Sequence, residues 1–169
     1  LDLYLDAIDH DDWKGVAALM SRSASLLAQA GAELIICPNN TLHRAFEFVR
    51  SPVPWLHIAA SVVAEANRRD FRKVGLLGTR VVMQGTVYQP IFEQVGIEIV
   101  CPHADESLEL DRIIRAELIR GEYLPWSRRY VQDMISTMAA NGAEAVILGC
   151  TELPLLLAEA PSGLPLLDS

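Results

Sequence analysis

Nearly the same phrase occurs twice in this chain, and the repetition limits the folds that the chain can adopt. GAELIICPN begins at Gly31 and GAEAVILGC begins at Gly142, and the two phrases align without a gap. Each is a short apolar run that lies between helix-like segments and ends in a polar loop. The repeat predicts two equivalent α/β lobes whose loops face one cleft. The alternative is that an alternating α/β chain repeats such a piece by chance.

The segments around the repeat alternate between patterns of apolar residues that are typical of strands and patterns that are typical of helices. The expected strands are short, apolar on both faces and flanked by glycines, which indicates mostly parallel sheets with helices on both sides. We expect strands at 33–37, 55–59, 73–77, 98–100, 145–148 and 164–167. We expect helices at 13–30, 41–49, 61–69, 84–94, 106–120 and 127–141, and another that opens near residue 152. We assign 1–56 plus 163–169 to a first lobe and 57–162 to a second.

The composition excludes several classes of protein. A net charge of −8 argues against nucleic acid or an anionic membrane as a partner. No apolar run approaches the roughly 20 residues that cross a bilayer, and the N-terminus is too acidic for a signal peptide. The three cysteines include no CxxC pair, so we expect a reducing, cytoplasmic setting. The chain starts at Leu1 and ends after a strand-like segment, so we expect the natural protein to extend beyond both ends.

Ligands of open parallel sheets bind beyond the carboxyl ends of the strands. The loops PNNT, GTR and GCTE are expected at that edge, where helix N-termini favour an anion such as a carboxylate. In the aligned phrases Cys150 falls opposite Asn39. The same N–H groups are expected to lower the pKa of the Cys150 thiol, which would make it a nucleophile or a base. We interpret Cys37 and Cys101 as small structural hydrophobes.

Two of these loops resemble the active-site motifs of the aspartate/glutamate racemase family. GCTELPLLL at 149–157 resembles the second motif of the family, and CPNNTLH at 37–43 resembles the first. PWLHIA, VGLLGT and LIRGEY match further family segments in the same order. The resemblance covers nearly the whole chain. The resemblance does not include two segments of the family, an N-terminal strand with a Gly-rich loop and a C-terminal helix.

The resemblance implies a pseudo-symmetric two-lobe α/β fold and racemisation of a small acidic amino acid or dicarboxylate without pyridoxal phosphate or another cofactor. It implies no metal, and it allows a homodimer. In the family, two cysteines flank the substrate α-carbon, and Cys150 corresponds to the second. The resemblance assigns the remaining substrate-binding positions to Asn40, Thr41, Thr151 and Thr79.

Asn39 stands where the family has its first catalytic cysteine. An amide has no accessible pKa near neutrality and cannot act as an acid or a base. Cys150 would then serve one face of the substrate, with water, His43 or Glu152 serving the other. His43 could equally be a hydrogen-bonded supporting residue, and Glu152 could orient the thiol or cap its helix. A single-cysteine decarboxylase or isomerase of a dicarboxylic acid, and a non-catalytic acid-binding domain, stay open as alternatives. We interpret His57 as structural.

Overall fold

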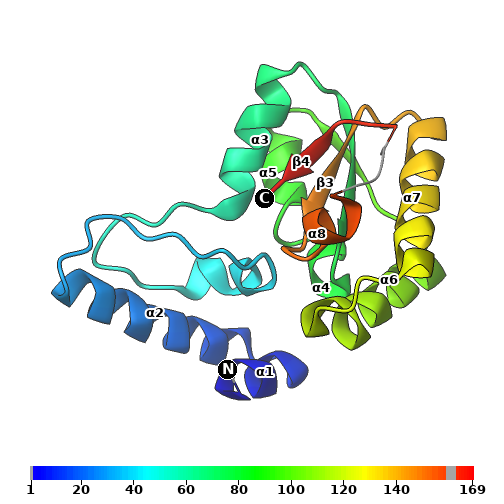
Figure 1. Cartoon of the computed structure of the whole chain (residues 1–169). Coiled ribbons are helices and arrows are strands. Elements are labelled where there is room, and N and C mark those ends of the chain that lie inside the picture. The colour runs from blue at the N-terminus through cyan, green and yellow to red at the C-terminus, as the bar shows by residue number, and fades with distance from the viewer. Residues whose placement is uncertain (1, 159–162) are drawn as a thin grey trace. The chain divides into compact units, whose positions relative to one another are not determined.

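A computed structural model of the chain describes residues 2–158 and 163–169 and contains two compact units (Figure 1). Unit 1 is Leu1–Ile58 and unit 2 is Ala59–Ser169. Among the described residues, no helix is long and apolar enough to cross a membrane.

Unit 1 is built on a long amphipathic helix, α2 (Trp13–Gln29). The Asp12 carboxylate caps this helix by accepting the Gly15 N–H at 2.8 Å. The buried face of the helix has helical spacing and consists of Trp13, Val16, Ala17, Met20 and Ala24. A preceding helix, α1 (Asp2–Asp9), has no buried residue. It therefore has no core-facing stripe to reveal it in the sequence.

The sheet predicted for the first lobe is wrong for the described part of unit 1. The expected strands 33–37 and 55–59 meet only at one parallel bridge, between Ile35 and Trp55. Pro38 and Pro54 flank this bridge, and proline has no N–H to extend a ladder. The helix expected at 41–49 is the 3₁₀ helix η1 (Thr41–Phe48).

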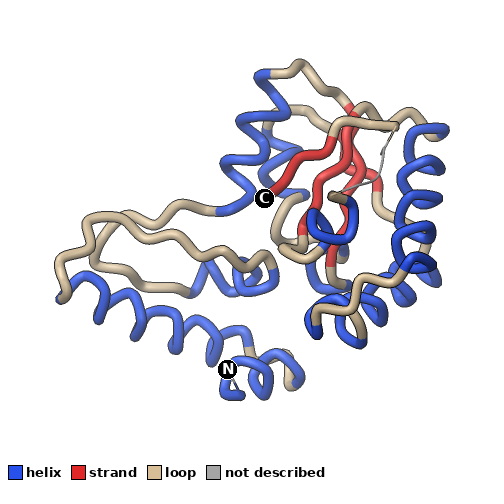
Figure 2. The backbone as a smooth tube through the Cα atoms, in the orientation of Figure 1, coloured by secondary structure: helices blue, strands red, loops and turns tan. Residues whose placement is uncertain are grey.

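Unit 2 contains a four-stranded parallel sheet with the strand order β2-β1-β3-β4 (Figures 1 and 2). The α/β class predicted from the sequence is therefore confirmed. The strands are β1 (Lys73–Gly78), β2 (Glu98–Val100), β3 (Ala145–Gly149) and β4 (Leu166–Asp168). The helices are α3 (Ile58–Arg68), α4 (Arg80–Met83), α5 (Gln89–Gln94), α6 (Ala104–Ala116), η2 (Leu118–Arg120), α7 (Pro125–Ala140) and α8 (Leu153–Leu157).

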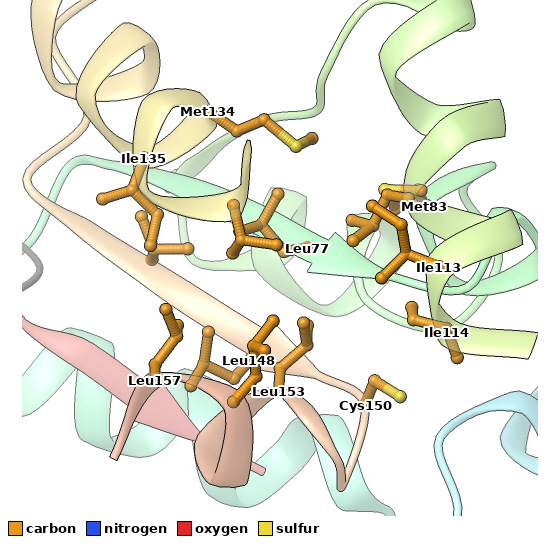
Figure 3. Packing of buried hydrophobic residues seen from close by; sticks show 14 of the residues in the cluster. Leu77, Met83, Ile113, Ile114, Met134, Ile135, Leu148, Cys150, Leu153 and Leu157 are labelled. Atoms are coloured by element: carbon orange, nitrogen blue, oxygen red, sulfur yellow. The ribbon is translucent and has the colours of Figure 1, made fainter. Parts of the chain in front are cut away.

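Helices cover both faces of this sheet, as the apolar strands require. Figure 1 shows α6 and α7 on one side and α3 and α5 on the other. On the α6–α7 side, Leu77 and Leu148 from the central strands pack into one buried cluster with Ile113 and Ile135 from the helices (Figure 3). Burial of this kind contributes roughly 25 cal/mol per Å² of apolar surface, which makes it the main force that holds the layers together.

Several predicted segments differ in detail from the structure. The helix expected at 84–94 is shorter in the structure: α5 begins at Gln89, and a turn in which Gly85 has a φ of +113° separates it from α4. The helix expected at 106–120 ends at Ala116 and continues as η2. Segment 163–169, assigned to the first lobe, contains β4, which pairs with β3 in unit 2. Residues 159–162 of the predicted second lobe lie outside the described residues.

The carboxyl ends of β1 and β3 meet at a pair of glycines. Gly78 and Gly149 are partners in the parallel register. A Cβ atom on Gly78 would lie 2.8 Å from the backbone oxygen of Gly149 and 3.2 Å from Val82 Cγ1 of α4. Glycine is thus required here for close packing, and its absent side chain lets α4 lie directly against the end of the sheet.

We predict that Gly78→Ala destabilises the chain by about 1–3 kcal/mol, the usual cost of overpacking, because a backbone oxygen cannot move aside. Gly75→Ala on the same strand is the matched comparison. Its Cβ would meet Met138 Sδ at 2.5 Å and Val146 Cγ2 at 3.2 Å, which are side-chain atoms and can shift more readily than a backbone oxygen. Urea unfolding should therefore give a larger decrease in midpoint for Gly78→Ala than for Gly75→Ala. Equal midpoints would contradict the close-packing account.

Candidate functional site

Two of the loops predicted to carry function leave neighbouring strands at the same edge of the sheet. Because Gly78 and Gly149 are paired, the residues that follow them, Thr79 and Cys150, begin the two loops side by side. The expectation that GTR and GCTE share the carboxyl edge is confirmed. Figure 3 shows Cys150 at the end of β3, at the border of the buried cluster.

The side chains of the GCTE loop form a small hydrogen-bonded group. The Cys150 thiol is 7% exposed and donates to Glu152 Oε2 at 3.0 Å. The Thr151 hydroxyl donates to the same oxygen at 2.8 Å. Glu152 is also the N-cap residue of α8, although its side chain makes no capping hydrogen bond. Its carboxylate therefore binds the thiol, which was one of the two roles expected for it.

The expectation of a lowered thiol pKa is wrong for Cys150. Burial, followed by the hydrogen bond to the Glu152 carboxylate, raises the pKa of Cys150 to about 12. The backbone N–H groups of Glu152 and Leu153 act in the opposite direction but have smaller effects. α8 has only five residues, so its dipole is weak. At neutral pH the residue is a thiol and not a thiolate.

Two helix N-termini that were expected to bind an anion already have protein acceptors. The Asn39 side-chain oxygen accepts the Leu42 N–H at 3.0 Å, within the first turn of η1. The Asp111 carboxylate of α6 accepts the N–H of Arg80, the first residue of α4, at 2.8 Å. At each of these two helix ends, one backbone N–H is therefore already bonded to a side chain of the protein.

In unit 1 the predicted site residues 39–43 adjoin a cluster of aromatic rings. Asn40 and His43 are buried, and Thr41 begins η1. His43 Nδ1 lies 2.9 Å from the Asn39 carbonyl oxygen, which fixes the ring against the loop. The His43 ring contacts His57 edge to face, with centroids 4.8 Å apart, and stacks at 5.7 Å on Phe46.

Both imidazoles of this cluster are neutral near pH 7. Burial lowers the pKa of His43. Burial and the neighbouring His43 lower the pKa of His57 to about 4. The sequence identified His57 as structural, which agrees with its packing on Phe46 at 4.8 Å. The sequence did not identify its contact with His43.

The other two cysteines, Cys37 and Cys101, also have thiol pKa values that burial raises. Burial raises the pKa of Cys37, and it raises the pKa of Cys101 to about 11. Cys101 donates to the Met83 carbonyl and borders two cavities, of about 350 and 290 Å³, that include no atom of Cys150. Within residues 2–158 and 163–169, no group of three or more His, Cys, Asp or Glu side chains could hold a metal ion.

The structure thus brings together the predicted residues of each unit. Asn39, Asn40, Thr41 and His43 are consecutive or one turn apart in unit 1, and Thr79 lies beside the Cys150–Thr151–Glu152 group in unit 2. Sequence analysis missed Asp111. Its spacing of four residues from Arg115 is typical of an exposed helical ion pair, so the sequence contains no signal of its contact with the loop after β1.

Comparison with known proteins points to one family. The family model for Asp/Glu/hydantoin racemase matches residues 5–169. The broad-specificity amino-acid racemase RacX of Bacillus subtilis is 27% identical over 96% of this chain and 69% of its own length. A glutamate racemase of Corynebacterium glutamicum is 27% identical over 80% of this chain, which spans about half of that protein, 49%.

A solved structure agrees with this result. A Yersinia pestis protein assigned to the Asp/Glu racemases has a TM-score of 0.87 and 32% identity, over 96% of this chain and 72% of that one. This match covers almost the whole chain. Both the fold and the sequence of this chain are therefore similar to those of the Yersinia pestis protein. The chain belongs to the Asp/Glu/hydantoin racemase family of cofactor-independent amino-acid racemases and their homologues.

Proposed function

We propose that the protein is a cofactor-independent racemase of a small acidic amino acid, of the aspartate or glutamate type, and that Cys150 transfers the α-proton. One observation carries the proposal: in a member of this family, the Cys150 thiol stands at the carboxyl end of β3, bonded to a carboxylate, at the sheet edge where Thr79 follows the paired strand β1. The names of the relatives, which include racemases of broad and of glutamate specificity, support the substrate class.

The proposed substrate contacts follow from the motifs. Thr79 and Thr151 of unit 2, with Asn40 and Thr41 of unit 1, hydrogen-bond the carboxylates of the substrate. Unit 1 and unit 2 are proposed to represent the two pseudo-symmetric lobes of the family. His43 supports the 39–43 loop through its contact with the Asn39 carbonyl.

The protonation state of Cys150 sets the direction of its step. Because its pKa is raised to about 12, the resting thiol donates its proton to an α-carbanion. The S–H bond breaks, the Cα–H bond forms, and the thiolate that remains is protonated by water. The substrate carboxylate delocalises the carbanion as an enediolate, which neighbouring donors stabilise. On the Asn39 face, water or His43 removes the first proton, because an amide cannot.

A decarboxylase of a dicarboxylic acid is the second candidate, and the same two residues favour it. Loss of CO₂ breaks a C–C bond and leaves its electron pair on Cα, so no base is required on the Asn39 face. The Cys150 thiol then supplies the one proton that the product needs. A chain with a protonated thiol and one amide meets these requirements as it stands.

We predict that the parent protein exchanges the α-hydrogen of aspartate or glutamate with deuterium in D₂O, followed by NMR. Cys150→Ser should reduce the exchange rate about 10²–10⁴-fold, the range for loss of a positioned acid or base. Cys101→Ser should change it little, since Cys101 lies beside other cavities. Exchange by Cys150→Ser at the parent rate would contradict the proposal. Tight binding with neither exchange nor CO₂ release would indicate a binding protein.

We predict that Asn39→Cys raises the rate of racemisation at least about tenfold, because it supplies an ionisable group for the second face. Asn39→Ser, which also lacks a group that titrates near neutrality, is the control and should give no increase. Polarimetry of aspartate and glutamate measures the rates. Steady release of CO₂ from a panel of dicarboxylic acids, with no gain in racemisation for Asn39→Cys, would favour the decarboxylase instead.

We predict that Glu152→Gln increases the rate of Cys150 alkylation by iodoacetamide at pH 8 about tenfold. Removing the carboxylate charge lowers the thiol pKa, and one pKa unit gives tenfold more thiolate. Peptide mass spectrometry resolves the sites, and Cys101 is an internal control because burial alone raises its pKa. If Cys150 and Cys101 are both alkylated at the parent rates in Glu152→Gln, then Glu152 does not hold the Cys150 thiol protonated.

A further inference from the structure

The loop that contains Thr79 is anchored by a residue from another element, Asp111 of α6. One Asp111 oxygen accepts the Arg80 N–H at 2.8 Å, and the other accepts Arg115 Nε at 2.8 Å. The Asp111 side chain is 15% exposed, whereas that of Arg115 is 49% exposed. A carboxylate that accepts a backbone N–H at a helix N-terminus forms a charge-assisted hydrogen bond, which is stronger than a neutral one.

The anchored residue begins a short helix that touches both strands of the site. The Thr79 carbonyl accepts the N–H groups of Val82 and Met83, each at 3.0 Å, so Thr79 and α4 form one rigid turn. Val82 Cγ1 lies 3.2 Å from the Cβ position of Gly78 and 3.0 Å from that of Gly149. Movement of α4 would therefore displace Thr79 and alter the packing on the residue that precedes Cys150.

We infer that Asp111, held by Arg115, is a positioning residue that fixes Thr79 beside Cys150 for substrate binding. This inference rests on the proposed function, in which Thr79 contacts a substrate carboxylate. Asp111 is not placed at the reacting atoms, because both of its oxygens are already bonded within the protein. Arg115 also offsets the negative charge of Asp111, which would otherwise oppose an acidic substrate near the loop.

The expected kinetic effect follows from what Thr79 does. A hydroxyl that binds the carboxylate equally in the ground state and the transition state contributes to KM and not to kcat. Loss of the anchor should therefore weaken substrate binding and leave the chemical step largely intact. A purely structural role for Asp111 would instead lower the fraction of folded protein, without raising KM.

The test compares three variants of the full chain. Asp111→Ala removes both hydrogen bonds, and Asp111→Asn keeps an oxygen for the Arg80 N–H but loses the charge. Glu109→Ala is the matched control, because Glu109 is also an acid of α6 paired with an arginine, Arg112, and makes no hydrogen bond to the Thr79 turn. KM and kcat for α-hydrogen exchange are measured for each variant, together with hydrogen exchange of the Arg80 amide by NMR.

We expect Asp111→Ala to raise KM about tenfold with kcat within about threefold, and to accelerate exchange of the Arg80 amide at least about tenfold. Asp111→Asn should recover most of both losses, and Glu109→Ala should match the parent. An unchanged KM in Asp111→Ala, or an Arg80 amide that stays as protected as in the parent, overturns the inference. If the parent turns over no substrate, the proposed function fails separately, and amide protection in the absence of substrate still decides whether Asp111 holds the turn.

Discussion

The contact between Gly78 and Gly149 is the constraint on which the rest of the site depends. Neighbouring parallel strands lie about 4.8 Å apart, and a helix can rest on their ends only where side chains are missing. The two glycines provide that space, so α4 packs against the end of the sheet. Thr79 and Cys150 then leave the sheet as neighbours. Asp111 of α6 stabilises this arrangement because its carboxylate accepts the backbone N–H of Arg80.

Electrostatics gives the site a preferred direction of proton flow. A cysteine at a strand exit is often expected to be a thiolate, yet here the nearest ionisable partner is an acid. Glu152 and burial together keep the proton on sulfur. Asn39 offers no compensating base. The combination favours donation of a proton to a carbanion over removal of one from a neutral α-carbon, and this asymmetry is why decarboxylation stands beside racemisation as a proposed function.

The sequence predicted the parts of the fold that depend on local patterns. The strands expected at 73–77, 98–100 and 145–148 agree with β1, β2 and β3 to within one residue, because continuous apolar runs between glycines have few alternatives. The segments 33–37 and 55–59 looked similar, but a strand also needs partners, and the prolines around Ile35 and Trp55 leave only one bridge.

The site could be predicted from the sequence only where the order of residues along the chain determines which groups lie at the edge of the sheet. The order of Gly, Cys, Thr and Glu placed the loop correctly, since parallel strands end at one edge. The sign of the thiol pKa shift depended on burial and on the rotamer of Glu152, which no spacing rule gives. The contact between Asp111 and Arg80 joins residues 31 positions apart, on elements whose packing had first to be known.

The paired imidazoles of unit 1 give the protein an acid boundary for its stability. The folded-state pKa of His57, about 4, lies below the ordinary histidine value of 6.5, so the unfolded chain binds more protons between these values. The stability that the neutral His57 contributes to unit 1 is therefore fully present above about pH 6.5 and is lost as the medium is acidified toward pH 4. The thiol of Cys150 would ionise only in strongly alkaline solution. Near neutral pH both groups are thus uncharged, the imidazole of His57 in unit 1 and the thiol of Cys150 in unit 2.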